Sequence, residues 1–151
     1  MNDAHKTYSA KPADVTRTWY QIDASDNTLG RISTEAAQHL TGKKKPMFTH
    51  NIDCGDYVVV INADKLKVTG QKLDDKVYYR HTGFPGGLKE RTLKEQMEID
   101  STKAIERAIR GMLPVNKLRD ARLKRLKIYA GTEHGHMAQK PVSLNLKKGA
   151  K

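Results

Sequence analysis

The chain lacks features that several classes of protein require. Cys54 is the single cysteine in 151 residues, so an internal disulfide and a zinc site built from several thiolates are excluded. No apolar run approaches the ~18 residues of a membrane helix. Residues 1–20 lack the apolar core of a secretory signal and include Asp3 and Asp14, whereas transit peptides are poor in acids. These absences predict a protein of the cytosol.

Aromatic residues are also scarce, at 6% of the chain, and the mean hydropathy is −0.72. This composition is typical of a globular chain with ample polar cover. A domain of this length can bury roughly 68–70% of the surface of its unfolded chain. Because neither an internal repeat nor a clear linker is present, we expect a single domain.

Acidic residues are missing mainly from the last third of the chain. Residues 1–100 hold 15 basic and 14 acidic side chains, whereas residues 101–151 hold 13 and 3, within a formal net charge of +11. A one-sided positive field favours a polyanion, since each neutralised phosphate releases condensed counterions. The alternative is a solvated lysine-rich surface that aids solubility.

Hydrophobic spacing predicts alternating strands and helices. Residues 57–61, YVVVI, form an unbroken apolar run typical of a strand buried on both faces. Apolar residues at helical spacing follow residue 28 and stop at Gly42. The other predicted elements are strands at 18–24 and 77–80, helices at 92–100 and from an N-cap at Ser101 to Met112, and a helix followed by a strand at 127–130. The pattern indicates an α/β domain with a largely parallel sheet.

The two ends differ from this pattern. Residues 1–17 are polar and lack periodicity, so we expect an extended N-terminal arm. Residues 142–151 resemble a partly ordered basic C-terminal tail. The single domain is therefore expected at residues 18–141.

The stretch YYRHTGFPGGLK, residues 78–89, contains three glycines and a proline. It matches neither the phosphate loop, which needs Lys and Ser/Thr after its second glycine, nor the dinucleotide fingerprint, because Pro85 takes the place of a glycine. A simple chain reversal would explain the Pro-Gly-Gly turn. The flanking Arg80, His81, Phe84 and Lys89 favour a contact loop instead.

Catalytic and metal-binding patterns are weak. Cys54 has His50 and Asp56 nearby in sequence, but this spacing establishes neither a base nor an oxyanion site. His134 and His136 would need further ligands to hold a metal, and a hydrogen-bonded pair near phosphate or backbone fits them better. We predict no catalytic centre, metal or cofactor. The alternative, a cytosolic α/β RNA-processing or nucleotide-using enzyme, lacks a recognisable constellation.

The basic residues give a stronger signal. From residue 107 to residue 127 the only acid is Asp120, and the planar fork of arginine suits phosphate. Lys43–Lys45 follow the first predicted helix, where they either bind phosphate or serve as a solvated cap. Neither a DNA-reading helix module nor the signature of a single-strand RNA-recognition sheet is evident. The pattern favours binding to the backbone of folded RNA.

Several stretches together resemble the bacterial large-subunit ribosomal protein L13 family. They cover residues 18 to 141 in the order of the family: TWYQIDASDNTLGR, GKKKPMFTHNIDCGDYVVVINADKLKVTG, KVYYRHTGFPGGLK, AIRGMLPVNKL and LKIYAGTEHGHMAQKP. Two positions depart from the family pattern, since relatives usually have glycine at Arg119 and a small residue such as threonine at Cys54.

The resemblance implies a three-layer α/β/α domain with a small, mostly parallel sheet and extended arms. It also implies binding to large-subunit ribosomal RNA beside neighbouring ribosomal proteins, a role in early subunit assembly, and no catalysis. The residues predicted to bind RNA, from charge and resemblance together, are Lys43, Lys44, Lys45, Arg80, His81, Thr82, Gly83, Phe84, Pro85, Gly86, Gly87, Lys89, Arg107, Arg110, Lys117, Arg119, Arg122, Lys124, Arg125, Lys127, His134 and His136.

Overall fold

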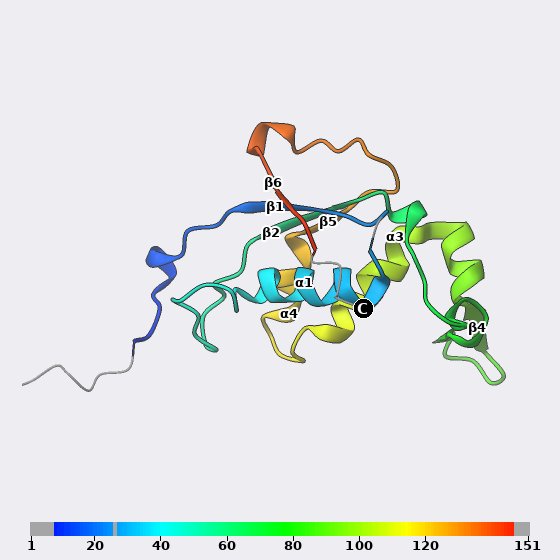
Figure 1. The fold of residues 1–151 in the computed structure, drawn as a ribbon. Helices are drawn as coiled ribbons and strands as arrows, with labels where there is room; N and C mark the ends of the chain where they lie inside the picture. Colours follow the sequence, from blue (N-terminus) through cyan, green and yellow to red (C-terminus); the bar gives the residue numbers. More distant parts are fainter. Residues whose placement is uncertain (1–7, 26, 147–151) are drawn as a thin grey trace, which may run out of the picture.

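A four-stranded parallel sheet forms the centre of the molecule (Figure 1). The structure is a computed structural model that describes residues 8–25 and 27–146. The strands lie in the order β5-β2-β1-β6, and all neighbouring pairs are parallel. They span β1 (Trp19–Asp23), β2 (Tyr57–Ile61), β5 (Leu126–Ile128) and β6 (Val142–Leu144). The predicted α/β class with a mostly parallel sheet is confirmed.

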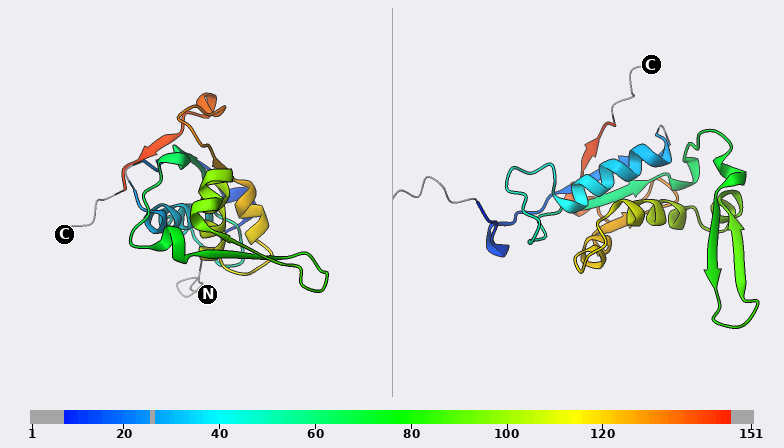
Figure 2. Two further views of the ribbon diagram at one scale, coloured as in Figure 1. Left: turned by 90° about the vertical axis from the view of Figure 1, so that its right-hand side faces the viewer. Right: turned by 90° about the horizontal axis from the view of Figure 1, so that it is seen from below.

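Three helices cover one face of this sheet. They are α1 (Leu29–Thr41), α3 (Leu93–Met112) and α4 (Arg119–Lys124), and they lie on the same side of the strands in Figures 1 and 2. Ile32 and Leu40 of α1 pack with Ile105 of α3 against the sheet, and all three are fully buried. Each such side chain stabilises the fold by about 1.5–3 kcal/mol. This core fixes the position of α3 on the sheet.

The opposite face of the sheet is covered by residues 129–141. This segment contains one short turn, η4 (Met137–Gln139). The ring of His136 lies 4.8 Å from that of Trp19 on β1, and Nε2 of His134 lies 3.3 Å from Oε1 of Gln21. The third layer implied by the resemblance is thus an irregular segment with one 3-10 turn.

Helix α1 ends at the predicted residue. Gly42 adopts φ 82° and its N–H donates to the carbonyls of Gln38 and His39, both at 3.1 Å. An added Cβ would lie 2.7 Å from the backbone of Cys54. The left-handed conformation and the close approach both require glycine.

Helix α3 has a kink at Asp100, where φ is −161° and ψ is 99°. Its first segment starts with a capping box between Thr92 and Glu95. Oδ1 of Asp100 accepts from the N–H groups of Thr102 at 3.0 Å and Lys103 at 3.4 Å, so Asp100 caps the second segment. The break into two helical segments was predicted, but the cap was predicted one residue too late. Ser101 is buried and instead donates to Asp64.

A two-stranded antiparallel hairpin extends away from the central sheet (Figure 2). It consists of β3 (Val77–His81) and β4 (Leu88–Thr92) and leads directly into α3. The strand at residues 77–80 was predicted. Strand β4 was not, because its sequence LKERT contains a single large apolar residue.

The termini take part in the fold more than the sequence suggested. Residues 142–144, within the predicted tail, form β6 and pair with β1 through Ile22 and Leu144. The described part of the predicted arm contains the short turn η2 (Pro12–Asp14). Strand β5 begins one residue earlier than the predicted strand at 127–130. Residues 1–7 and 147–151 of the predicted arm and tail lie outside the described residues.

Candidate nucleic-acid interface

The tip of the hairpin is a tightly bonded glycine loop. Thr82 N–H donates to Gly87 O at 3.0 Å, and Gly87 N–H donates to Phe84 O at 2.9 Å. Gly83 and Gly86 adopt φ of 90° and 70°, and a Cβ at Gly87 would lie 2.0 Å from Thr82 Oγ1. These glycines are required by backbone conformation and close contact. The loop is therefore a preformed shape.

The two faces of the hairpin differ in chemistry. The register pairs Arg80 with Lys89 on one face and His81 with Leu88 on the other, since directly opposed residues share a face. Phe84 at the tip is 74% exposed. The hairpin therefore has one cationic face, together with exposed aromatic and aliphatic surface elsewhere.

A groove of 320 Å³ lies between this hairpin and α3. We call it the hairpin groove. Its lining includes Tyr78 and Gln96, one acidic residue, Glu90, and five cations: Arg80, Lys89, Arg91, Lys103 and Arg107. Lys103 is paired with Asp100 at 3.1 Å, and the other four cations are exposed. The groove is therefore a strongly cationic concave surface.

Tyr78 links the base of the hairpin to α3. The guanidinium of Arg107 lies 4.8 Å from its ring centroid, and Lys76 Nζ lies 5.5 Å away. Burial raises the pKa of Tyr78, and the charge of Arg107 opposes this only in part, so the phenol is neutral at pH 7. The electron-rich face of this neutral ring attracts both cations.

Two of the predicted RNA-binding arginines lie inside the protein. Arg122 and Arg125 are 2% and 6% exposed. The guanidinium of Arg125 binds both carboxylate oxygens of Asp53, at 2.5 and 2.7 Å, and donates to Leu40 O at 3.2 Å. Arg122 Nε lies 3.5 Å from Asp53. A phosphate cannot reach these groups, so we exclude both from the interface.

The carboxyl group of Asp53 is strongly held by this cluster. Burial alone would raise its pKa, but hydrogen bonds and charge from Arg125 outweigh burial and lower the pKa below 3.8. The ion pair thereby fastens the loop between α1 and β2 to α4.

The three lysines that follow α1, Lys43–Lys45, also divide into one residue with a buried partner and two residues at the surface. Lys45 pairs with buried Asp56 at 2.5 Å and donates to Thr16 O at 2.7 Å, so it ties the N-terminal arm to the domain. Lys44 pairs with Glu35 on the surface, and Lys43 is exposed. Lys45 is thus a structural residue rather than a phosphate ligand.

The other residues predicted to bind RNA differ in their exposure and in their contacts. Arg110, Lys117 and Lys124 are exposed, whereas Lys127 is half-buried. The guanidinium of Arg119 donates to the carbonyls of Pro114 and Leu113 at 3.3 and 3.4 Å, which closes the turn between α3 and α4. His134 and His136 are half-buried against the sheet, so their first partners belong to the chain itself.

Several cations beside the interface were missed by the sequence analysis. Arg91 and Lys103 line the hairpin groove, and Lys67, Lys72 and Lys76 surround a pocket at its side. Lys72 and Lys76 flank Asp74 and Asp75 in sequence, so their charges are balanced locally. Their location could only be recognised once the hairpin was folded against α3.

Among the described residues, no cluster of three His, Cys, Asp or Glu side chains could hold a metal ion. Cys54 is fully buried, with its Sγ 3.8 Å from Met47 O. No helix in the described part of the chain has the length and apolarity needed to cross a bilayer.

The fold and this surface define a small α/β protein with a cationic groove formed by a hairpin and a helix. A family model described as ribosomal protein L13 matches residues 17–135. The chain belongs to the ribosomal protein L13 family.

Relatives match over nearly the whole length. The chain is similar to the large ribosomal subunit protein uL13 of Halorhodospira halophila, with 57% identity over 141 residues that cover 93% of this chain and 99% of the relative. It is 55% identical over 142 residues to the protein of the same name from Neisseria gonorrhoeae, covering 94% and 99%. The protein of that name from Alcanivorax borkumensis is 57% identical over 141 residues, covering 93% and 99%. Membership of this family supports a structural role and gives no support to the enzymatic alternative.

Proposed function

We propose that the protein is a structural constituent of the cytoplasmic large ribosomal subunit, where it binds ribosomal RNA and supports early assembly of the particle. The observation that carries this proposal is the hairpin groove, in which five cations and one acid line a single concave surface. The full-length relatives named as large-subunit proteins support the choice of particle.

The groove suits phosphates better than base edges. Arg80, Arg91 and Arg107 offer planar donors that can hold a phosphate through two hydrogen bonds. The backbone of the glycine loop can approach a sugar-phosphate chain closely because three of its positions carry no side chain. A rigid protein surface of this kind recognises folded RNA by its shape. By binding only the folded form, it stabilises that form during assembly.

The other surface of the hairpin favours a second kind of contact. Phe84 and Leu88 are 74% and 54% exposed, and Tyr79, which also borders the hairpin groove, is 65% exposed. Bases of RNA can stack on the two rings, and a neighbouring ribosomal protein can cover Leu88. Such contacts would position the hairpin between RNA and a protein neighbour in the particle.

The salt dependence of binding tests the proposal. If about six phosphates are neutralised, a plot of log affinity against log salt for the protein and its ribosomal RNA fragment should have a slope of about −5, by analogy with duplex DNA. Substitution of Arg80, Lys89 and Arg107 by Gln should reduce this slope by about three units.

Lys11 provides a control. It precedes η2, at the end of the molecule opposite the hairpin (Figure 1). Lys11→Gln should change the slope by less than about one unit. A slope near zero for the wild-type protein, or an unchanged slope for the triple variant, would contradict the proposal.

A further inference from the structure

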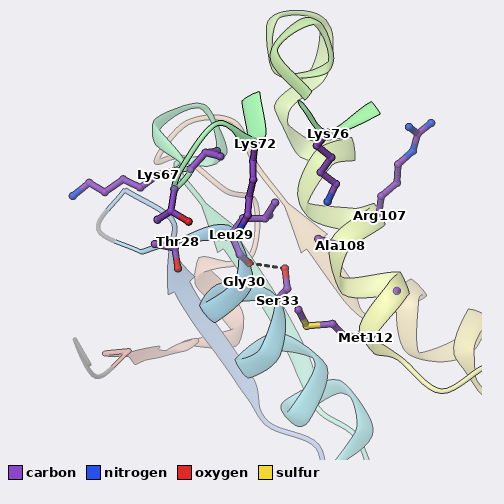
Figure 3. A pocket seen from close by; sticks show the side chains of 13 residues that line it. Thr28, Leu29, Gly30, Ser33, Lys67, Lys72, Lys76, Arg107, Ala108 and Met112 are labelled. Carbon is purple, nitrogen blue, oxygen red and sulfur yellow. Dashed lines mark hydrogen bonds between the residues drawn. The ribbon is translucent and has the colours of Figure 1, made fainter. Parts of the chain in front are cut away.

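A second hollow, of 470 Å³, lies beside the hairpin groove (Figure 3). We call it the α1–α3 pocket. The N-terminal turn of α1 and the C-terminal half of α3 form two of its walls, and residues 67–69, Lys72 and Lys76 complete it. Leu29, Ala108 and Met112 provide apolar surface. The cations around it are Lys67, Lys72, Lys76 and Arg107, and none of the 13 lining residues is acidic.

The walls of the pocket are fixed by hydrogen bonds. Leu29 N–H donates to Lys67 O at 3.3 Å, and Thr28 forms an isolated parallel bridge with Lys67. Ser33 Oγ donates to Leu29 O at 2.7 Å (dashed in Figure 3). At the other wall, Leu93 N–H donates to Lys76 O at 2.8 Å. The pocket therefore exists before any ligand enters, which lowers the entropic cost of binding.

Two glycines keep the pocket open. Gly30 lies in the first turn of α1 and Gly111 in the last turn of α3. Glycine is a poor helix residue compared with alanine, yet an added Cβ at either position would meet no described atom within 4 Å. Neither residue has a positive φ. Packing within the described chain therefore explains neither glycine, whereas close approach of a ligand would explain both.

The pocket is continuous with the proposed RNA surface. Arg107 lines both hollows. Tyr78, which lines the hairpin groove, also supports Lys76 at the rim of the pocket. The two hollows are therefore close enough for one RNA strand to contact both.

We propose that the α1–α3 pocket receives one unpaired nucleotide of the ribosomal RNA held in the hairpin groove. The base lies over Leu29, Ala108 and Met112, and the adjoining phosphates contact Lys72, Lys76 and Arg107. This proposal rests on the proposed function. The pocket volume falls within the about 300–1,000 Å³ of small-ligand sites, and proteins that read RNA commonly bind bases splayed out of loops and bulges. A phosphate alone would leave the apolar floor unused.

Filling the pocket tests this assignment. Gly30→Leu should occupy the space from within, whereas Gly30→Ala adds one methyl group and leaves most of the space free. Full-length wild-type and variant proteins are bound to the large-subunit RNA fragment, and the reactivity of each unpaired base toward chemical modification is measured. Wild type and Gly30→Ala should protect one unpaired base that Gly30→Leu leaves reactive. Gly30→Leu should also bind about tenfold more weakly, which is the scale expected when one apolar group is no longer buried, with an unchanged salt slope.

A second variant, Gly111→Leu, fills the pocket from its other wall and should give the same result. Circular dichroism and the melting temperature show whether each variant is folded. If both filled variants fold and still protect the base with full affinity, the pocket assignment is overturned while the proposed function stands. If wild type fails to bind the RNA, both proposals fall.

Two further titrations test whether the pocket binds a free nucleotide or an acidic peptide instead of a nucleotide of the RNA. The four ribonucleoside 5′-monophosphates and a poly-glutamate peptide are titrated separately into the free protein and followed by amide chemical shifts. If the mononucleotides and the peptide bind weakly or undetectably up to about 1 mM, the result supports a pocket that is occupied by a nucleotide of the bound RNA strand. Tight binding of a mononucleotide that persists when RNA is bound would overturn the RNA source. Saturable binding of the peptide that Gly30→Leu abolishes would instead assign the pocket to an acidic protein.

Discussion

The arginines in and next to α4 are close in sequence to the arginines of α3, but the two groups differ in burial and in role. Arg122 on α4 and Arg125, the residue that follows α4, are buried against Asp53, whereas Arg107 and Arg110 on α3 are exposed. All four belong to the basic stretch that predicted RNA binding. The comparison shows that the density of positive charge identifies a polyanion-binding protein but does not identify the side chains that bind.

The difference arises from a distant partner. Asp53 lies 72 positions before Arg125 in the chain, in the loop that joins α1 to β2. At Gly55 in the same loop an added Cβ would lie 1.8 Å from Leu40 O and 2.9 Å from Arg125. The loop thus leaves room for the guanidinium, and α4 is held against the end of α1.

The largest effect is expected from breaking the buried cluster. Arg125→Met leaves Asp53 without its two-pronged partner, and removal of one partner from a buried ion pair costs about 3–5 kcal/mol. The free energy of unfolding from urea denaturation should fall by this amount. Arg122 also pairs with Asp53, so the triple variant Arg125→Met, Arg122→Met and Asp53→Leu should recover most of the loss, because none of the three buried charges is then left unpaired. A loss below about 1 kcal/mol for the single variant would show that the cluster is not structural.

Substitution of the two exposed arginines of α3, Arg107 and Arg110, should weaken RNA binding and leave the stability of the fold nearly unchanged. Arg107→Gln combined with Arg110→Gln should change the free energy of unfolding by about 0.5 kcal/mol or less. Affinity for the ribosomal RNA fragment should fall about tenfold at moderate salt, and the salt slope should decrease by about two units. Filter binding at several salt concentrations measures both. A loss of stability without loss of affinity would reverse the roles assigned to the two helices.

A smaller effect on the free energy of unfolding is expected at acid pH, where Asp53 becomes protonated. The pKa of Asp53 is lower in the folded protein than its ordinary value of 3.8, so its ionised form stabilises the fold at pH above 3.8. This contribution falls as the pH drops below 3.8 and is lost below the folded pKa. The difference in unfolding free energy between wild type and Asp53→Asn should therefore shrink as the pH falls from about 5 toward 2. Using this difference cancels the contributions of Asp23 and Asp100, whose pKa values are also lowered.

The smallest effect is expected at the surface. Lys44 and Glu35 form an ion pair in which the side chains are 43% and 32% exposed, and such pairs contribute about 0–1 kcal/mol. Lys44→Gln should therefore leave the melting temperature nearly unchanged. Lys45→Gln is the matched comparison, because its partner Asp56 is 3% exposed, and it should lower the melting temperature clearly. Equal shifts for the two variants would contradict the division of the lysine run.

Local patterns in the sequence predicted much of the fold. The run YVVVI forms β2, and Gly42 ends α1, because burial on both faces and a left-handed cap leave direct traces in a few adjacent residues. The sequences of strands β4 and β6 contain no such local pattern. The first is a charged strand that depends on its partner β3, and the second contributes three residues whose register is set by β1, more than 120 positions earlier.

The candidate site was predicted less completely than the fold. The glycine loop and Arg107 could be proposed from the sequence because unusual composition and charge mark them there, and their contact with RNA stays a prediction. Arg122, Arg125 and Lys45 were predicted to bind RNA, but the structure places each in an ion pair within the chain, with a carboxylate partner that becomes adjacent only through tertiary packing. Lys72 and Lys76 were overlooked because neighbouring aspartates balance their charge in the sequence.

The pairing of β6 with β1 has a consequence for the order of folding. The hairpin and α3 form one continuous stretch, residues 77–112, and the two strands of the hairpin pair across a short loop, a contact between near neighbours that forms rapidly. The central sheet lacks β6, the strand at one of its edges, until residues 142–144 emerge, which is after residues 77–112. The hairpin can therefore form before the sheet is complete, so the surface that we propose to bind RNA can be present before the final step of folding.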